Sequence, residues 1–395
     1  MTTTPTLPAL ARALKNPTAA TMLDLSGKRL QEIPPELGQL ASLEELNLAE
    51  NRLARLDAPL FALAALKRLA LTQNQLAALD AGVGQLKALE CLHLNDNRLT
   101  ELPAEIGQLT GLRELWLDTN QLVRLPEGIA RLTRLEDLRL GNNRLTALPE
   151  ALGALTALRR LELNRNKLEA LPDAVGGLAG LEVLYLSANA LTALPGTMGE
   201  LARLATLHLK NNALAHLPPG LRKLGALADL NLAGNPLGAA ALEGLGGIPS
   251  LRELELSATA CETLPDLSAC ASLRVFWCAD NRLTALPSWI GQLQGLEVLG
   301  AGGNQLTALP PEIGRLGKLR ILRLGGNQLA ELPAEIGALT SLRTLDLRGN
   351  QLRAVPDSIG GLSAVAELNV RGNPLPEDEL RKIARLLPQT EVFFG

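Results

Sequence analysis

Leucine recurs along most of the chain at fixed offsets. From Ala20 onward the residues follow the pattern LxxLxLxxNxLxxLPxxIGxLxx, and nearly every unit of this pattern is 23 residues long. The first residues of the sixteen successive units are Ala20, Leu43, Leu66, Leu89, Leu112, Leu135, Leu158, Leu181, Leu204, Leu227, Leu251, Leu273, Leu296, Leu319, Leu342 and Val365. A period of about 20–29 residues with this leucine spacing predicts a solenoid built from one supersecondary unit per repeat.

The positions within a unit predict its strand and its core. We expect positions 3–5 to form a short parallel strand and the leucines at positions 1, 4, 6 and 11 to point inward. No single unit can bury its apolar face alone, so the core exists only in the stack. The predicted fold is α/β: a right-handed solenoid of about 16 repeats, a horseshoe whose concave face carries a parallel β-sheet.

Asparagine and proline recur at two further positions of the unit and support this prediction. Position 9 is asparagine in fourteen of the sixteen units, from Asn51 to Asn373. Its amide can bond backbone groups of neighbouring turns that would otherwise be buried without a partner. Position 15 is often proline, as at Pro103 and Pro126, which fixes an extended backbone. The IGxL that follows predicts one loose helical turn on the convex side.

The ends of the chain depart from the repeat and are expected to cap it. Residues 1–19 are predicted to form an N-terminal cap with a short helix around Leu10, residues 20–373 the repeat array, and residues 374–395 a helical C-terminal cap. Terminal repeats need such caps for solubility. The chain is therefore expected to be complete, without a kinase, GTPase or ligase domain. Within 227–272 one unit has 24 residues and the next 22, and this irregularity either bends the array, binds a ligand or is drift in the repeat.

Composition and charge exclude several classes of protein. Apolar residues make up 47% of the chain but aromatic residues only 2%, so leucine has to build the core. The formal net charge of −3 argues against a nucleic-acid binder, which usually carries a basic excess. No apolar run is long enough to span a membrane, and the start of the chain lacks the features of a signal peptide. The expected compartment is the cytoplasm, with export as an effector without a cleaved signal as the alternative.

The 23-residue unit with LPxxIGxL resembles those of bacterial and Ras-group leucine-rich-repeat proteins, which include plant intracellular members and the repeat part of Roco proteins. It is less similar to the shorter-repeat bacterial effector ligases. From the residues themselves we expect a non-catalytic monomer without cofactors that binds a protein partner on its concave face, in signalling. The resemblance implies a protein-interaction scaffold. It does not identify the partner, and a regulatory subunit of a separate signalling enzyme is an alternative.

One motif resembles catalytic chemistry. Cys278-Ala279-Asp280 matches the CxD motif of bacterial ubiquitin ligases linked to leucine-rich repeats, so ligase activity through Cys278 is a second alternative. However, Cys278 occupies position 6, which is an inward core position, and a buried cysteine is an inert small hydrophobe. Cys261 and Cys270 also replace core residues, which leaves Cys91 as the exposed thiol. The histidines are too far apart to share a metal ion, so no metal site is predicted.

Charges alternate in sign at position 2, from Glu44 and Lys67 through Glu90 and Arg113 to Glu136. Neighbouring strands place these side chains next to one another, so we expect internal pairs, such as Glu90 with Arg113, and little contribution to binding.

Position 5 instead collects aromatic residues. Three of the four Trp and Tyr residues in the chain, Trp116, Tyr185 and Trp277, occupy it. Trp, Tyr and Arg dominate interface hot spots, and because this column points away from the core, truncating them should affect binding more than folding. We predict two partner-binding patches, one comprising Trp116, Asp118, Arg139, Glu162, Tyr185, His208 and Lys210, and one comprising Val275, Trp277, Val298, Gly300, Ile321 and Arg323.

Overall fold

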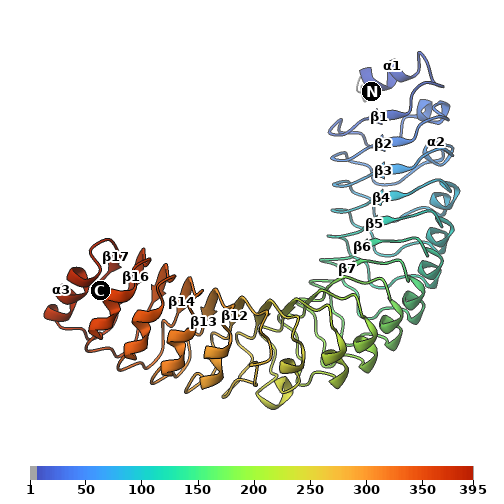
Figure 1. Ribbon diagram of the computed structural model, residues 1–395. Coiled ribbons are helices and arrows are strands. Elements are labelled where there is room, and N and C mark those ends of the chain that lie inside the picture. The colour runs from blue at the N-terminus through green and yellow to red at the C-terminus, as the bar shows by residue number, and fades with distance from the viewer. Residues whose placement is uncertain (1–6, 395) are drawn as a thin grey trace. The chain divides into compact units, whose positions relative to one another are not determined.

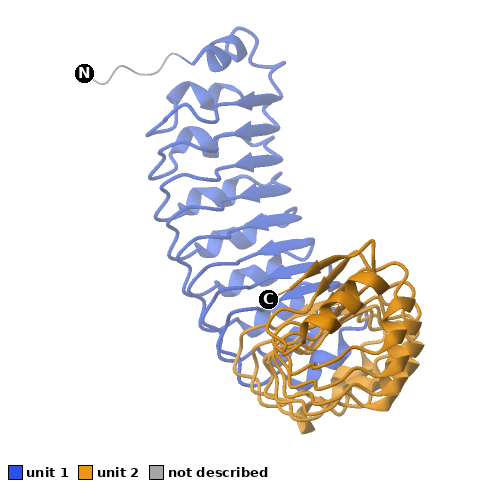
Figure 2. Cartoon of the chain, turned by 90° about the vertical axis from the view of Figure 1, so that its left-hand side faces the viewer, with its two compact units in different colours: residues 1–204 blue, residues 205–395 orange. Residues whose placement is uncertain are grey.

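The computed structural model describes residues 7–394 and divides the chain into two compact units, residues 1–204 and residues 205–395 (Figure 2). Each unit is described by itself. In both, short parallel strands lie side by side along one face and short helices lie along the opposite face (Figure 1). We call these the strand face and the helix face.

In unit 1, each strand is three residues long, and successive strands from β1 to β8 pair in parallel. The strands are β1 (Met22–Asp24), β2 (Glu45–Asn47), β3 (Arg68–Ala70), β4 (Cys91–His93), β5 (Glu114–Trp116), β6 (Asp137–Arg139), β7 (Arg160–Glu162) and β8 (Val183–Tyr185). Every strand occupies positions 3–5 of its repeat, as the leucine pattern predicts.

Unit 2 follows the same plan. Its strands are β9 (Thr206–His208), β10 (Asp229–Asn231), β11 (Glu253–Glu255), β12 (Val275–Trp277), β13 (Val298–Gly300), β14 (Ile321–Arg323), β15 (Thr344–Asp346), β16 (Glu367–Asn369) and β17 (Glu391–Phe393). The strands of the 24- and 22-residue repeats still pair in the regular register: Leu230 pairs with Leu254, and Leu254 pairs with Phe276. The irregular lengths are therefore absorbed on the helix side of these repeats.

The helix face consists mainly of single 3-10 turns that begin after the proline of position 15. In unit 1 the helical segments are α1 (Pro8–Ala13), η1 (Pro35–Gln39), α2 (Ala58–Phe61), η2 (Ala81–Gln85), η3 (Ala104–Gln108), η4 (Glu127–Arg131), η5 (Glu150–Ala154), η6 (Asp173–Gly177) and η7 (Gly196–Glu200). In unit 2 they are η8 (Pro219–Lys223), η9 (Ala240–Leu242), η10 (Leu245–Gly247), η11 (Ser288–Gln292), η12 (Pro311–Arg315), η13 (Ala334–Ala338), η14 (Asp357–Gly361) and α3 (Glu377–Leu386). No helix among residues 7–394 is both long and apolar enough to cross a membrane.

The core of each unit is a set of leucine columns, a column being one position in successive repeats. In the repeat that begins at Leu112, the residues of positions 1, 4, 6 and 11 (Leu112, Leu115, Leu117 and Leu122) are fully buried. Cys261, Cys270 and Cys278 are also completely buried, as their positions predict, whereas Cys91 is half-buried.

The asparagines of position 9 satisfy backbone groups between repeats. Asn120 Nδ2 donates to the carbonyl oxygens of Leu94 and Leu117, at 2.9 and 3.0 Å, and Asn120 Oδ1 accepts from Leu99 N at 3.0 Å. In one repeat Thr259 replaces this asparagine, and its Oγ1 donates a hydrogen bond to the carbonyl oxygen of Leu256 in the same repeat. The asparagine column is therefore a hydrogen-bonded ladder inside the stack.

Helices lie at both ends of the described chain. α1 buries Leu10, whereas residues 1–6 of the expected N-terminal cap lie outside the described residues. At the other end, α3 buries Ile383, and Leu387, directly after it, is also buried. Phe393 belongs to β17, a strand that the leucine pattern does not predict, and Phe394 is 38% exposed.

Candidate functional site on the strand face

The aromatic ring of Trp116 is held between two side chains of the strand face of unit 1. The imidazole of His93, on the preceding strand β4, stacks on the indole with ring centroids 3.8 Å apart and an angle of 6° between the planes. The guanidinium of Arg139, on the following strand β6, lies 4.1 Å from the indole ring. Strands are about 4.8 Å apart, so position 5 of three consecutive repeats makes one continuous stack.

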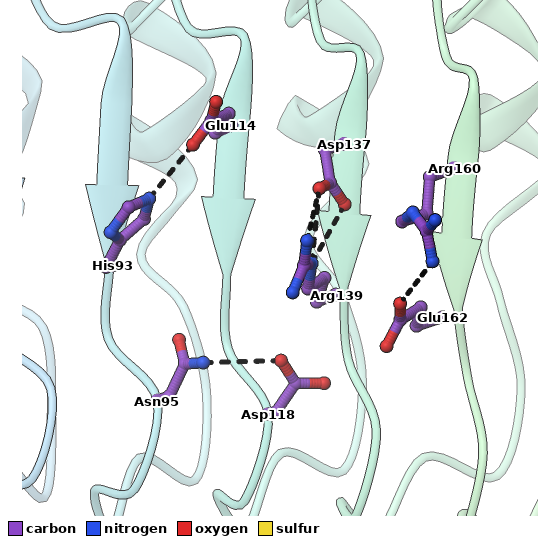
Figure 3. A network of polar contacts seen from close by, with 8 residues as sticks. All are labelled: His93, Asn95, Glu114, Asp118, Asp137, Arg139, Arg160 and Glu162. Atoms are coloured by element: carbon purple, nitrogen blue, oxygen red, sulfur yellow. Dashed lines mark hydrogen bonds and ion pairs between the residues drawn. The ribbon is translucent and has the colours of Figure 1, made fainter.

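Carboxylates fix both ends of this stack (Figure 3). Asp137 accepts hydrogen bonds from Arg139 Nε and Nη2, with distances of 3.1 and 2.9 Å to Asp137 Oδ2. Glu114 Oε2 lies 3.1 Å from His93 Nε2. These contacts order the arginine and the histidine before any partner arrives.

Asp118 lies beside the stack at position 7 and is partly buried. Asp118 Oδ1 accepts from the backbone N–H of Gly141 at 2.8 Å, and Asn95 Nδ2 donates to Asp118 Oδ2 at 3.4 Å (Figure 3). Burial raises the pKa of Asp118 to about 6, although the Gly141 hydrogen bond acts in the opposite direction. Nearby, Asn95 Oδ1 and Trp116 Nε1 are buried without a hydrogen-bond partner. This corner of the strand face therefore carries polar groups that its own residues satisfy only in part.

The predicted residues Glu162 and Tyr185 continue this surface. Arg160 Nη1 donates to Glu162 Oε1 at 2.9 Å, and the Arg160 guanidinium lies 5.6 Å from the Tyr185 ring. Tyr185 is half-buried, like Trp116. Each of these two rings thus has an arginine within the roughly 6 Å of a cation–π contact.

Unit 2 carries a different surface. The indole of Trp277 lies against the backbone of Gly300 on the next strand, so closely that a Cβ at position 300 would collide with the ring. This contact explains the glycine at position 5 of that repeat. The guanidinium of Arg323, one strand further, lies 5.4 Å from the Trp277 ring.

A short apolar row runs beside Trp277. Val275, Val298 and Ile321 occupy position 3 of three consecutive strands, pair in register and are half-buried. The structure therefore brings together all residues of the second predicted patch.

The first predicted patch is divided by the boundary between the units. Trp116, Asp118, Arg139, Glu162 and Tyr185 lie in unit 1, and His208 and Lys210 in unit 2. Within unit 2, His208 Nε2 lies 2.8 Å from Asp229 Oδ2, and Lys210 is exposed.

Charges at position 2 form ion pairs, but one pair differs from the expectation. Arg113 Nη1 lies 2.6 Å from Glu136 Oε1, so the prediction that Arg113 pairs with Glu90 is wrong. Lys67 pairs with Glu44 at 2.8 Å, and this bond, followed by the charges of Glu44 and Glu90, raises the pKa of Lys67. Arg113 has a glutamate at position 2 of the repeat on either side, Glu90 and Glu136, and the sequence does not show which of the two it pairs with.

Sequence reasoning missed His93, Asp137 and Arg160, which hold the aromatic rings in place. The signal was present in the repeat spacing: His93 is one repeat before Trp116, and Asp137 is two residues before Arg139 on the same face of the strand.

Cys278 and Cys91 both lack the properties of a catalytic thiol. Burial holds the pKa of Cys278 far above its ordinary value, and the thiol has no exposed surface. Burial also raises the pKa of Cys91, to about 11. A reactive cysteine needs a lowered pKa and access to solvent. Among residues 7–394, no group of three His, Cys, Asp or Glu side chains is placed to hold a metal ion.

Comparison with known proteins identifies the family. A family model described as a leucine-rich repeat region matches residues 58–166, 146–264 and 312–388, and a second, described as a leucine rich repeat, matches residues 18–76. The chain belongs to the leucine-rich-repeat family. The predicted solenoid fold is confirmed, and this family consists in general of non-catalytic binding scaffolds. No curated protein matches the chain.

Solved structures place this leucine-rich-repeat protein among bacterial and plant relatives. A leucine-rich-repeat protein of Leptospira interrogans is 36% identical, with a TM-score of 0.91 and 98% of both chains covered. The plant peptide hormone receptor RGFR1, in complex with RGF2, is 32% identical with a TM-score of 0.76, covering 89% of this chain and 59% of the receptor. The ectodomain of the Arabidopsis thaliana receptor kinase GASSHO1/SCHENGEN3, in complex with CASPARIAN STRIP INTEGRITY FACTOR 2, is 29% identical with a TM-score of 0.56, covering 94% of this chain and 55% of that chain.

Proposed function

We propose that this protein is a non-catalytic scaffold that binds a protein partner on its strand face. The observation that carries the proposal is that each tryptophan or tyrosine ring at position 5 has an arginine guanidinium within cation–π distance: Arg139 at Trp116, Arg160 at Tyr185 and Arg323 at Trp277. These residue types dominate binding hot spots. Because the rings are ordered in the free protein, less conformational entropy is lost when a partner binds.

The likeness to RGFR1 and to the Arabidopsis receptor supports a polypeptide ligand and motivates a role in a signalling assembly. The strand face offers such a ligand two surfaces of different character. The surface around Trp116 is polar and charged, whereas Val275, Trp277 and Val298 offer apolar contact. A ligand of the first surface has to present aromatic or polar groups, and a ligand of the second has to present aliphatic groups.

The proposal is tested with the full chain as bait, followed by dissociation constants for the captured partner. Trp116→Ala and Trp277→Ala should each weaken binding by about thirtyfold or more, as for a hot spot of about 2 kcal/mol. Trp289→Ala, on the helix face, and Arg113→Gln, in the Arg113–Glu136 pair, are the controls and should bind like the wild type. Trp116 is packed on both faces, so its truncation also lowers stability, and each affinity is measured where the variant is folded. Normal binding by both strand-face variants, with loss in Trp289→Ala, would move the site to the helix face.

A further inference from the structure

The column of leucines at position 14 is interrupted in unit 2. In the regular repeats this residue is buried, with an exposed fraction of 7% or less, from Ile33 and Leu56 to Leu332 and Val355. In the repeat that begins at Leu227, position 14 is Ala240. The leucines at this position in the repeats before and after, Leu217 and Leu264, are only half-buried. Three neighbouring repeats therefore share one defect in an otherwise closed column.

A pocket of about 230 Å³ opens at this defect. Leu217, Pro218 and Pro219 line it from one repeat, and Ala240 and Gly244 line it from the next. Gly244 has no atom within 4 Å of the place where its Cβ would be, which shows how open this wall is. The volume would hold several water molecules, at about 30 Å³ each. The pocket therefore has room for a branched aliphatic side chain.

The rim of the pocket is cationic. His216 and Arg222 belong to the lining and are exposed, and none of the lining residues is acidic. Two charged residues adjoin the lining in the sequence: Lys223, which follows Arg222 at the end of η8, and the exposed Glu243, which precedes Gly244. An apolar pocket with such a rim is complementary to an aliphatic side chain with a carboxylate close to it.

We propose that this pocket binds a leucine side chain of a protein partner, with an acidic residue next to that leucine in the partner pairing with Arg222. The incoming leucine occupies the space that the position-14 leucine would fill in a regular repeat, and it covers Leu217. The site belongs to the helix side of unit 2 and contains no residue of the strand face. It is therefore a second contact region, and its test is independent of the test of the strand face.

Short peptides test the pocket without a partner in hand. We use acetyl-Glu-Leu-Glu-amide as the probe, with acetyl-Glu-Ala-Glu-amide and acetyl-Lys-Leu-Lys-amide as controls, and detect binding to the full chain by saturation-transfer NMR. The leucine methyl groups of the acidic probe should receive saturation, and both control peptides should receive markedly less. Equal transfer to the acidic and basic leucine peptides would contradict the acidic part of the proposal, and no transfer to the acidic probe would overturn all of it.

Variants locate the binding. Ala240→Leu and Gly244→Leu both place a side chain in the pocket and should abolish transfer to the acidic probe. Arg222→Gln should weaken binding by about two- to fivefold, the range for an exposed ion pair. Arg315→Gln, in the last turn of η12 and away from the pocket, is the matched control and should leave the signal unchanged. Transfer that persists in both filling variants, with their folding checked by circular dichroism, would place the probe elsewhere and overturn the proposal.

Discussion

At the scale of single residues, the turn that leaves each strand depends on one strained position. Position 8 has a positive φ in all sixteen repeats, as at Thr119, Arg165 and Gly326. Six of these residues are glycine, and the other ten carry a side chain in a conformation that costs L-residues roughly 1–2 kcal/mol. The stack tolerates this strain because the same turn brings the asparagine of position 9 to its ladder.

The glycines of this column should therefore resist substitution. Gly326→Ala, at a φ of +70°, should lower the free energy of unfolding by about 1 kcal/mol. The matched control is Gly317→Ala, where the new Cβ meets no atom within 4 Å and φ is not positive, so stability should be unchanged or slightly higher. Denaturant melts of the two variants measure the change in the free energy of unfolding. An equal effect of both substitutions would show that the backbone conformation of position 8 is not the cause.

Asp118 should make stability depend on pH. Its pKa of about 6 in the folded protein exceeds the ordinary value of 3.8, mainly because of burial. The folded state therefore holds the proton more tightly, and this residue's contribution to stability falls as the pH rises from about 4 to about 6. Glu162 raises this pKa, and Arg139 and the Gly141 N–H lower it.

Asp118→Asn removes the ionisation but keeps an oxygen for the Gly141 N–H. The variant should be more stable than the wild type at pH 8, and the difference should shrink towards pH 4.5. Urea midpoints of both proteins across this range measure it. A variant that is less stable than the wild type at pH 8 would mean that the carboxylate is stabilised by its surroundings.

Residue types predict some of these features and not others. Asparagine at position 9 is nearly invariant along the chain, and only an amide both donates and accepts in the ladder, so its role could be predicted. Position 8 holds residues as different as Glu50, Thr119 and Arg165, and this variety hides the conformation they share. The partly satisfied polar groups at Asn95 and Trp116 depend on side-chain positions, which no periodic pattern specifies.

At the scale of elements, each repeat contributes one strand and one set of inward leucines. Leu184, at position 4 of β8, is 1% exposed. Leu184→Ala should lower the free energy of unfolding by roughly 2–5 kcal/mol, because a buried leucine leaves a cavity.

The control for Leu184→Ala is Val123→Ala, at a valine that is 48% exposed, where the loss should be small. Both losses are measured by denaturant melts under the same conditions. A loss below about 1 kcal/mol for Leu184→Ala would show that the register of the repeat is wrong.

The elements that the sequence predicts best are those with the full pattern. The strands at positions 3–5 and the helical turns after Pro103 or Pro126 follow directly from it. In the repeat that begins at Leu227, the Leu-Pro pair of positions 14 and 15 is missing. The sequence shows that the repeat is irregular there, but η9, η10 and the pocket beside Ala240 appear only in the structure. β17 lies beyond the last repeat, so no leucine pattern predicts it.

At the scale of the whole molecule, the question is whether the chain binds or catalyses. The ligase alternative requires Cys278 to be a reactive thiol, and the structure buries it completely. Iodoacetamide at pH 8 should leave Cys278 unlabelled in the folded protein and label it after denaturation, as mass spectrometry of the digested peptides would show. Cys91, half-buried with a pKa of about 11, should react slowly in the folded protein. Rapid labelling of native Cys278 would revive the ligase alternative.

The central claim is that the strand face binds a polypeptide, and hydroxyl-radical footprinting of the protein with its captured partner tests it most directly. Tryptophan oxidation reports solvent access at three sites: Trp116 on β5, Trp277 on β12 and Trp289 on η11. We predict that the partner protects Trp116, Trp277 or both by at least about threefold and leaves Trp289 as reactive as in the free protein. The reverse pattern, with Trp289 protected and both strand-face residues unchanged, would contradict the account.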